Sequence, residues 1–227
     1  MKVIAVNGSF RKNWNTHKML TSALEGAASR GAETELVNLF DVDFKGCIGC
    51  LGCKRKGGVI GRCALKDGLT PILDSIHKCD ALIIGSPIYL GEVTGVMRSF
   101  IERLLFQYIS YDKDRTPLFG RKLPSACIYT MNAPGHVLDD IGYTAKFKAY
   151  EETFERILGG PCQTILATET WQTEDYDKFH MTMMDVPARV KRHEEVFPED
   201  CRNAYNVGAK LGTRKTTKPG ASFGGLL

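Results

Sequence analysis

Four of the eight cysteines in this chain lie within seventeen residues, in the stretch CIGCLGCKRKGGVIGRC. Cys47, Cys50, Cys53 and Cys63 follow the pattern C-x2-C-x2-C-x9-C. Three thiolates at this spacing can wrap one face of a cubane, and a more distant fourth completes the ligand set of a [4Fe-4S] cluster. The glycines of the stretch permit tight turns, and its lysines and arginines would offset the negative charge of a thiolate-ligated cluster.

Two other uses of these four thiols stay open. A tetrahedral zinc ion also takes four thiolates, but its sites usually separate two CxxC pairs instead of using a CxxCxxC run. A thiol-rich loop without any metal is the third interpretation. The remaining cysteines are Cys79, Cys127, Cys162 and Cys201, which are spread along the chain and are typical of buried small apolar residues.

A second group of polar residues follows the first apolar run, in the loop NGSFRKNWNT at positions 7–16. A loop between a buried parallel strand and the start of a helix is a common phosphate site, because backbone N–H groups and the helix dipole attract anions. We expect Ser9 and Thr16 to donate hydrogen bonds to the phosphate and Arg11 to pair with its charge. Neither GxGxxG nor GxxxxGK[ST] occurs here, which favours a single phosphate over a pyrophosphate. The alternative is that Asn15 or Thr16 only caps the helix.

Two more loops of this kind end later apolar runs. In the loop GSPIYLGEV at positions 85–93, Pro87 stiffens the turn and Tyr89 offers a ring edge. The backbone amides of Ile88, Tyr89, Leu90 and Gly91 suit the polar edge of a flat heterocycle. The loop TMNAPGH at positions 130–136 contributes Met131, Asn132 and Gly135, which let the backbone approach a ring. For Tyr89, a packed surface tyrosine is the alternative.

The elements that must position these loops alternate along the chain. Short apolar runs predict strands at 2–6, 33–38, 81–85, 125–130 and 163–168. Apolar residues at helical spacing predict helices at 16–30, 95–106 and 140–158. This alternation predicts an α/β fold, a flavodoxin-like three-layer sandwich with a five-stranded parallel sheet in the order 2-1-3-4-5. The first and third strands would then flank the switch point, and the cysteine block, following the second strand, is expected on the same edge as the polar loops.

The chain continues beyond this predicted domain. Residues 1–170 form the expected domain, with a cysteine-rich insertion at 46–66. Residues 171–211 are expected to be a helical extension, in which 187–195 and 198–211 form one helix interrupted at Pro198 or two helices. Residues 212–227 lack periodicity and are expected to be a mobile tail, or an arm that becomes ordered on a neighbouring subunit.

The composition restricts the class of protein. The 227 residues are 43% hydrophobic and 25% charged, with a formal net charge of +4, as in an ordinary globular protein. No apolar run is long enough to span a membrane and no secretory signal is evident, so we expect a cytoplasmic protein without a membrane partner. Basic residues are scattered, so nucleic acid is not expected as a partner.

The three loops together resemble the NAD(P)H-dependent FMN reductase branch of the flavodoxin-like superfamily, and within it most closely the iron-sulfur flavoproteins. The resemblance covers roughly residues 1–170 and rests on NGSFRKNWNT, the cysteine block, and GSPIYLGEV followed by a helix ending in FIER. Phe10 replaces the usual proline of the first loop. The resemblance implies that the first loop binds the FMN phosphate through Ser9, Arg11, Asn15 and Thr16. It implies that the second loop cradles the isoalloxazine ring through Pro87, Ile88, Tyr89, Leu90 and Gly91.

The resemblance also implies an activity. FMN would accept a hydride from NADH or NADPH and pass electrons, through a [4Fe-4S] cluster if one is present, to an acceptor that the sequence does not name. It implies a ferredoxin-type or other redox partner and assembly as a homodimer or homotetramer. No side chain is demanded as a general acid or base, so no catalytic residue is nominated. The alternatives are a non-catalytic flavoprotein that shuttles electrons between protein partners and a binding module that has lost flavin.

Overall fold

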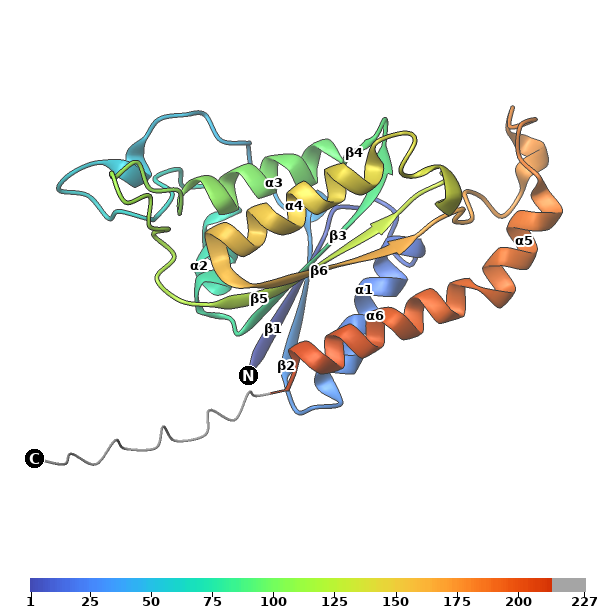
Figure 1. The fold of residues 1–227 in the computed structure, drawn as a ribbon, viewed down its shortest axis with the longest axis horizontal. Helices are drawn as coiled ribbons and strands as arrows, with labels where there is room; N and C mark the ends of the chain where they lie inside the picture. Colours follow the sequence, from blue (N-terminus) through green and yellow to red (C-terminus); the bar gives the residue numbers. More distant parts are fainter. Residues whose placement is uncertain (214–227) are drawn as a thin grey trace, which may run out of the picture.

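The computed structural model describes residues 1–213, which form an α/β sandwich (Figure 1). The strands are β1 (Lys2–Asn7), β2 (Glu33–Asn38), β3 (Ala81–Tyr89), β4 (Glu92–Val93), β5 (Leu123–Thr130) and β6 (Gly159–Ala167). The helices are α1 (Asn15–Ala28), α2 (Thr70–Lys78), α3 (Gly95–Phe106), α4 (Tyr143–Leu158), α5 (Val186–Glu195) and α6 (Phe197–Leu211). Short 3-10 turns lie at η1 (Leu39–Asp41), η2 (Gly52–Lys54), η3 (Gly135–Val137) and η4 (Tyr176–Lys178).

Five strands pair in parallel in the order β2-β1-β3-β5-β6. Apart from β4, the order is the one predicted from the sequence, so the flavodoxin-like fold is confirmed. The two-residue strand β4 pairs antiparallel with the end of β3, which extends beyond the predicted strand to form a hairpin. The carboxyl ends of β1 and β3 are neighbours, which places the first two polar loops side by side.

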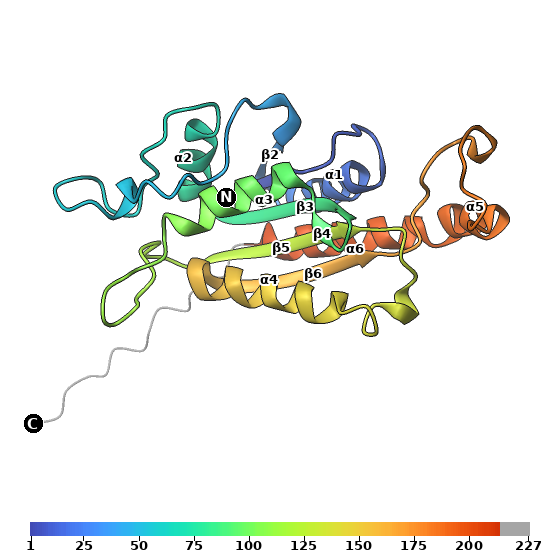
Figure 2. The ribbon, with the colours of Figure 1, turned by 90° about the horizontal axis from the view of Figure 1, so that it is seen from above.

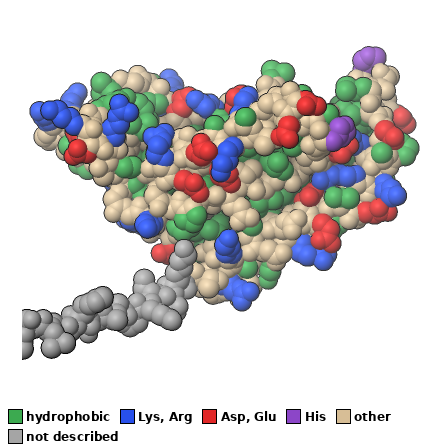
Figure 3. Space-filling model, in the orientation of Figure 1, with side chains coloured by type: hydrophobic (Ala, Val, Ile, Leu, Met, Phe, Trp, Pro, Cys, Tyr) green, Lys and Arg blue, Asp and Glu red, His purple; other side chains and the backbone are tan. Residues whose placement is uncertain are grey.

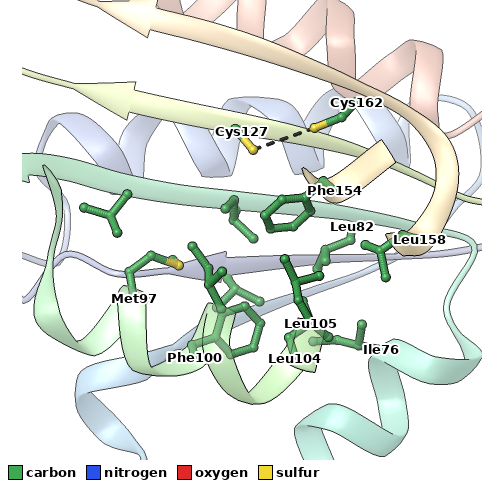
Figure 4. Packing of buried hydrophobic residues seen from close by; sticks show 14 of the residues in the cluster. Ile76, Leu82, Met97, Phe100, Leu104, Leu105, Cys127, Phe154, Leu158 and Cys162 are labelled. Atoms are coloured by element: carbon green, nitrogen blue, oxygen red, sulfur yellow. Dashed lines mark hydrogen bonds between the residues drawn. The ribbon is translucent and has the colours of Figure 1, made fainter. Parts of the chain in front are cut away.

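The sheet separates two apolar layers because side chains alternate along each strand. Ile4 and Val6 of β1 face the layer formed by α2, α3 and α4, whereas Val3 and Ala5 face α1 and α6 (Figures 1 and 2). In the first layer, Phe100, Leu104 and Leu105 of α3 pack with Phe154 and Leu158 of α4 beneath the strands (Figure 4).

Helix α6 lies against α1 at a distance that only glycine allows. A Cβ atom on Gly208 would lie 1.7 Å from the carbonyl oxygen of Ala23, and one on Gly26 would lie 2.0 Å from that of Tyr205. Ala204 and Phe197 of α6 are buried in the same layer. The helical extension therefore completes this face of the sandwich.

Three local features differ from the sequence prediction or extend it. Helix α2 was not predicted, because it has only nine residues and its apolar stripe is short. The extension forms two helices with a break at Val196, and each has a proline in its first turn. The tail predicted at 212–227 lies outside the described residues from 214 onward. Within residues 1–213, no helix has the length and apolar character needed to cross a lipid bilayer.

Candidate functional site

A cavity of about 370 Å³ opens beside the carboxyl ends of β1, β3, β5 and β6. Ten of the twelve residues predicted to bind a cofactor line it: Ser9, Arg11, Asn15, Thr16, Pro87, Ile88, Tyr89, Leu90, Met131 and Asn132. Gly91 and Gly135 are not among the lining residues. Parallel strands end at the same edge of a sheet, so loops far apart in sequence converge on one cavity.

The first loop is held by short side chains at the start of α1. Ser9, Asn15 and Thr16 are buried, and the Asn7 side chain accepts the Ser9 N–H at 2.9 Å. The Thr16 hydroxyl shares a hydrogen bond of 2.8 Å with Thr130 at the end of β5. Among residues 1–213, no side chain caps α1, whose N-cap is Trp14. The capping role considered for Asn15 and Thr16 is therefore wrong, and the first N–H groups of the helix can receive an anion.

The second loop is a tight hairpin tied to the first loop through one threonine. Thr94 donates from its hydroxyl to the Gly8 carbonyl at 2.8 Å, and its N–H donates to the Ser86 hydroxyl at 3.0 Å. Leu90 and Gly91 form the turn with φ values of 52° and 80°. Tyr89 is 59% exposed, so it is not a packed surface tyrosine. Gly91 serves the turn, where its carbonyl accepts from the Lys146 Nζ at 2.8 Å.

The cavity has a further wall that sequence reasoning missed. Thr170, Trp171 and Gln172, directly after β6, line it together with Trp14 and Thr130. Trp14 was not among the residues selected from the sequence, and Trp171 and Gln172 were placed in the helical extension. One signal was available: this segment also follows the carboxyl end of a parallel strand, where ligand-binding loops gather.

The cysteine block lies at the other end of the molecule from this cavity, and its expected place on the same edge is wrong. After β2 the chain runs alongside α3, where Gly46 lies near Ser99, and reaches the end of that helix. The Lys54 ammonium donates to the carbonyls of Phe106 and Gln107 at 2.8 Å each. Figure 1 shows the loop at the end of α3 opposite to the β3–β4 hairpin. The contacts with α3 therefore determine where the cysteine loop lies, and the position of β2, which precedes the loop, does not.

The four cysteines of the block nevertheless meet. Cys47, Cys50, Cys53 and Cys63 all line one small cavity of about 20 Å³. Within residues 1–213, no three His, Cys, Asp or Glu side chains are close enough to hold a single metal ion. A cubane places its four sulfur ligands farther apart than one ion does, because each binds a different iron.

Arg103 of α3 fixes this cysteine cavity. Its side chain is fully buried and donates to both Asp67 oxygens at 2.7 and 3.1 Å, to the Lys45 carbonyl at 2.9 Å and to the Cys63 Sγ at 3.1 Å. It therefore ties together both ends of the cysteine loop. The hydrogen bonds from Arg103 lower the pKa of Asp67. Burial raises the pKa of the Cys53 thiol, and the neighbouring Lys54 charge opposes that shift.

Of the remaining cysteines, three lie in the core and Cys201 lies on α6, where it packs against the apolar layer that includes α1. Cys79, Cys127 and Cys162 are buried, and burial raises the pKa of Cys79 to about 11. The Sγ atoms of Cys127 and Cys162 lie 3.8 Å apart between β5 and β6 (Figure 4). Their place beneath α4, away from both cavities, agrees with the packing role expected for scattered cysteines.

The sheet order and a cavity at the carboxyl ends of its strands define a flavodoxin-like α/β protein. A family model described as NADPH-dependent FMN reductase matches residues 1–135 of the chain. The chain therefore belongs to the NADPH-dependent FMN reductase family. The match includes the first two loops and the whole cysteine block.

The matches to curated relatives include only part of each protein. An iron-sulfur flavoprotein of Methanocaldococcus jannaschii is 37% identical over 103 residues, which are 45% of this chain and 51% of the relative. An iron-sulfur flavoprotein of Archaeoglobus fulgidus is also 37% identical over 103 residues, which are 45% of this chain and 48% of the relative. The chain thus matches about half the length of these curated relatives.

Solved structures support the fold over nearly the whole chain. The NAD(P)H:quinone oxidoreductase from Methanothermobacter marburgensis has a TM-score of 0.70 at 13% identity, covering 93% of this chain and 98% of its own. An azoreductase from Bacillus anthracis has a TM-score of 0.63 at 13% identity, covering 92% and 99%. At this level of identity, the likeness shows the fold alone.

Proposed function

We propose that the chain is an FMN-dependent oxidoreductase that takes electrons from NADH or NADPH. The observation that carries this proposal is the cavity at the strand ends, in which the residues selected from three loops of the sequence meet. Membership of the FMN reductase family supports the choice of FMN. When bound, FMN supplies the hydride and electron chemistry, and the protein supplies position and electrostatics.

The residues of the cavity suit the two ends of FMN. At one end, Ser9, Thr16 and the uncapped N-terminus of α1 offer hydroxyl and backbone donors to a phosphate, and the Arg11 guanidinium supplies positive charge. At the other end, the rigid hairpin holds Tyr89 and Leu90 beside the opening, where they would shield a ring from water. No side chain in the cavity is required to transfer a proton.

Anaerobic stopped-flow mixing tests this activity. The full chain, reconstituted with FMN, is mixed with NADPH or NADH while the flavin absorbance is followed. Rapid bleaching by either nucleotide is expected, and comparison of the two rates identifies the preferred donor. A flavin that binds but is reduced by neither nucleotide would contradict the reductase, whereas absence of FMN binding would leave a binding module that has lost flavin as the better account.

We also propose that Cys47, Cys50, Cys53 and Cys63 hold a [4Fe-4S] cluster. The four thiols line one cavity, and the Arg103 Nε donates to the Cys63 Sγ at 3.1 Å, as a charge-offsetting donor would to a cluster thiolate. The names of the curated relatives support the same choice. The cluster would serve as an electron relay to an outside acceptor.

Iron and acid-labile sulfide per chain, measured on anaerobically purified protein, test the cluster. We expect about four of each per chain. The Cys63→Ser variant tests whether the nine-residue gap still lets the last thiol bind, and it should lower the iron content. The matched control is Cys201→Ser, which removes a thiol packed near α1 and should leave the iron content unchanged. Wild-type protein without iron would leave the cysteine block as a loop of free thiols.

A second candidate function, an electron carrier between protein partners, is favoured by the surface around the cysteines. Residues 45–66 carry six lysines and arginines and no acidic residue. Ile48, Leu51, Val59 and Ile60 of the same loop are exposed, so the loop presents apolar side chains together with basic ones. The basic side chains at this end of the molecule are visible in Figure 3. Such a surface suits an acidic redox protein, of the ferredoxin type among others.

The two candidates differ in their electron donor. A carrier would be reduced by an acidic redox protein, at a rate that falls steeply with salt, and would react slowly with NADPH and NADH. A reductase would show the opposite preference. We further propose that residues 1–170 form the FMN-binding domain and that the extension completes it, since Trp171 and Gln172 line the cavity. Assembly as a homodimer or homotetramer is also a proposal, to be tested by light scattering of the full chain.

A further inference from the structure

A second large cavity adjoins the cysteine cavity, far from the cavity at the strand ends. Its volume is about 590 Å³, within the roughly 300 to 1,000 Å³ that small-molecule sites occupy. Cys50 and Cys63 line both this cavity and the small cavity where the four cysteines meet. A molecule bound in the larger cavity would therefore lie against two of the four thiols proposed as cluster ligands.

The nine residues between Cys53 and Cys63 build one wall of this larger cavity. The residues of the gap that line it are Arg55, Gly58, Val59 and Arg62. Backbone hydrogen bonds fold the gap, because the Gly58 N–H donates to the Arg55 carbonyl at 3.1 Å and the Gly61 N–H donates to the Cys53 carbonyl at 2.9 Å. The long gap thus has a structural use, since it closes one side of a cavity beside the thiols.

The opposite wall comes from α2 and from the chain that leads to it, which lie beside the cysteine loop (Figure 2). Leu65 and Leu73 line this side, and Leu73 is buried in the core. The nearby Thr70 hydroxyl donates to the Leu65 carbonyl at 3.2 Å and accepts from the Asp67 N–H at 3.1 Å. This wall is therefore fixed in place and largely apolar, which suits the face of an aromatic ring.

The charged side chains that line the cavity are mainly basic. They are Arg55, Arg62, Lys66 and Asp74. Arg62 and Asp74 form an ion pair at 3.2 Å. Among residues 1–213, neither Arg55 nor Lys66 has a carboxylate within ion-pair distance. Two cationic groups therefore remain to attract a negatively charged ligand.

We propose that this cavity binds a small, electron-accepting aromatic anion. Arg55 and Lys66 would attract its charge, and Val59, Leu65 and Leu73 would contact its ring. In the redox step, one electron passes from the reduced cluster to the ligand, so the cluster is oxidised and the ligand is reduced, and no atom or proton moves with the electron. This electron step rests on the proposed function, which supplies the cluster and the electrons from NADH or NADPH, whereas binding of the anion does not.

Equilibrium dialysis with two matched probes tests the site. The full chain, purified anaerobically and supplied with excess FMN to fill the strand-end cavity, is dialysed against anilinonaphthalene sulfonate or against phenylnaphthylamine, which lacks only the sulfonate. We expect the sulfonate to bind more tightly. The double variant Arg55→Gln, Lys66→Gln should raise the Kd of the sulfonate by about tenfold, because two partly exposed charge pairs are lost. The Kd of the uncharged probe should stay unchanged.

Matched variants separate the cavity from the general charge of the loop. The control Lys45→Gln, Lys56→Gln removes two exposed charges from the same loop that do not line the cavity, and it should leave both Kd values unchanged. Val59→Ser should raise the Kd of both probes, because both carry the rings. Anthraquinone sulfonate, an aromatic anion that can accept electrons, should displace anilinonaphthalene sulfonate from the wild type.

The outcomes separate this inference from the proposed function. An equal change in the two double variants, or wild-type protein that binds neither probe, would overturn the site, even if an acidic redox protein bound at this end. Wild-type protein that binds the sulfonate as expected but contains no iron would confirm the site and overturn the electron step together with the cluster. A flavin that neither nucleotide reduces would contradict the reductase and leave the anion site in place.

Discussion

The two ends of helix α3 carry the two candidate centres, and the ends are built in different ways. At its N-terminus, Thr94 joins the loops after β1 and β3, and the cavity wall comes mainly from strand ends whose positions the sheet determines. At its C-terminus, the cysteine loop contains only one short 3-10 turn between η1 and α2, and side chains of α3 hold it. Arg103 of α3 donates to the loop, and Gln107, which directly follows the helix, accepts from the Cys63 N–H.

This difference predicts how each end tolerates change. The sheet would keep the flavin cavity in place when one lining side chain is removed, because its loops are set by backbone pairing. The cysteine end depends on a few long side chains, so one substitution should release the loop. The centres are separated by the twelve residues of α3, a length of about 18 Å at the usual helical rise.

The largest expected effect follows from removing the buried anchor of the cysteine end. Arg103→Met removes the charged donor of Asp67 and of the Lys45 carbonyl and leaves Asp67 with only the Leu69 N–H, which should lower the free energy of unfolding by about 3 kcal/mol. Iron content should fall with it, whereas FMN affinity should stay near the wild-type value. Denaturant unfolding, iron analysis and flavin titration of one preparation measure all three quantities.

Arg98→Met is the control, because Arg98 lies on the same helix and its ion pair with Glu102 is exposed. It should change stability by less than about 1 kcal/mol. If Arg103→Met lowered FMN affinity and iron content to the same extent, the two ends of α3 would unfold as one cooperative unit. The expected difference in their tolerance to substitution would then be wrong.

The flavin end should be most sensitive to charge. Ser9→Asp places a carboxylate at the expected phosphate position and should weaken FMN binding by about 100-fold, as expected from a lost donor and a new repulsion. Ser29→Asp makes the same change at the opposite end of α1 and should leave the affinity unchanged. Flavin fluorescence titration measures both variants. An equal loss of affinity in the two variants would indicate a long-range charge effect. An unchanged affinity in both would show that the phosphate does not bind at Ser9.

Much of the fold and of the flavin cavity could be predicted from the sequence. The strand at Glu33–Asn38 and helix α3 were predicted with their observed bounds, because an alternating pattern and an apolar stripe determine them locally. Most of the lining residues of the first three loops, but not Trp14 or Thr130, were selected because each loop directly follows an apolar strand. Their convergence then follows from the parallel sheet alone.

Features set by long-range packing could not be predicted in this way. The cysteine loop lies where Arg103 and Lys54 hold it, and neither residue has a local pattern that names its partner. Trp171 was missed for a related reason. Its carbonyl bonds to Asn15, which is 156 residues away, so its place in the cavity depends on the path of the chain after β6.

Acidification should weaken the cysteine end by a smaller amount. Arg103 lowers the pKa of Asp67 below its ordinary value of 3.8. A carboxylate with a depressed pKa in the folded state stabilises the protein above the unfolded pKa, and the contribution is lost as the pH falls through the folded pKa. The difference in unfolding free energy between wild type and Asp67→Asn should therefore be constant near neutral pH and shrink below pH 3.8. Denaturant unfolding at a series of pH values measures it.

Asp74→Asn is the control for this pH profile, because the Asp74 pair with Arg62 is exposed and contributes little. Its profile should follow the wild type throughout. A difference for Asp67→Asn that stays constant through the acidic range would show that the ion pair with Arg103 does not stabilise the folded chain.

The smallest expected effect concerns strain in the flavin hairpin. Leu90 has a φ of 52°, a value that favours asparagine or glycine, and its side chain is fully exposed. Leu90→Asn should therefore raise the free energy of unfolding by about 0.5 to 1 kcal/mol. Gly91→Ala, at a φ of 80°, should lower it, because alanine is strained there. Thermal unfolding with and without FMN measures both. If Leu90→Asn also weakens FMN binding, the contact of Leu90 with the ring explains why a leucine occupies this strained position. The flavin end would then depend on an individual side chain as well as on the sheet.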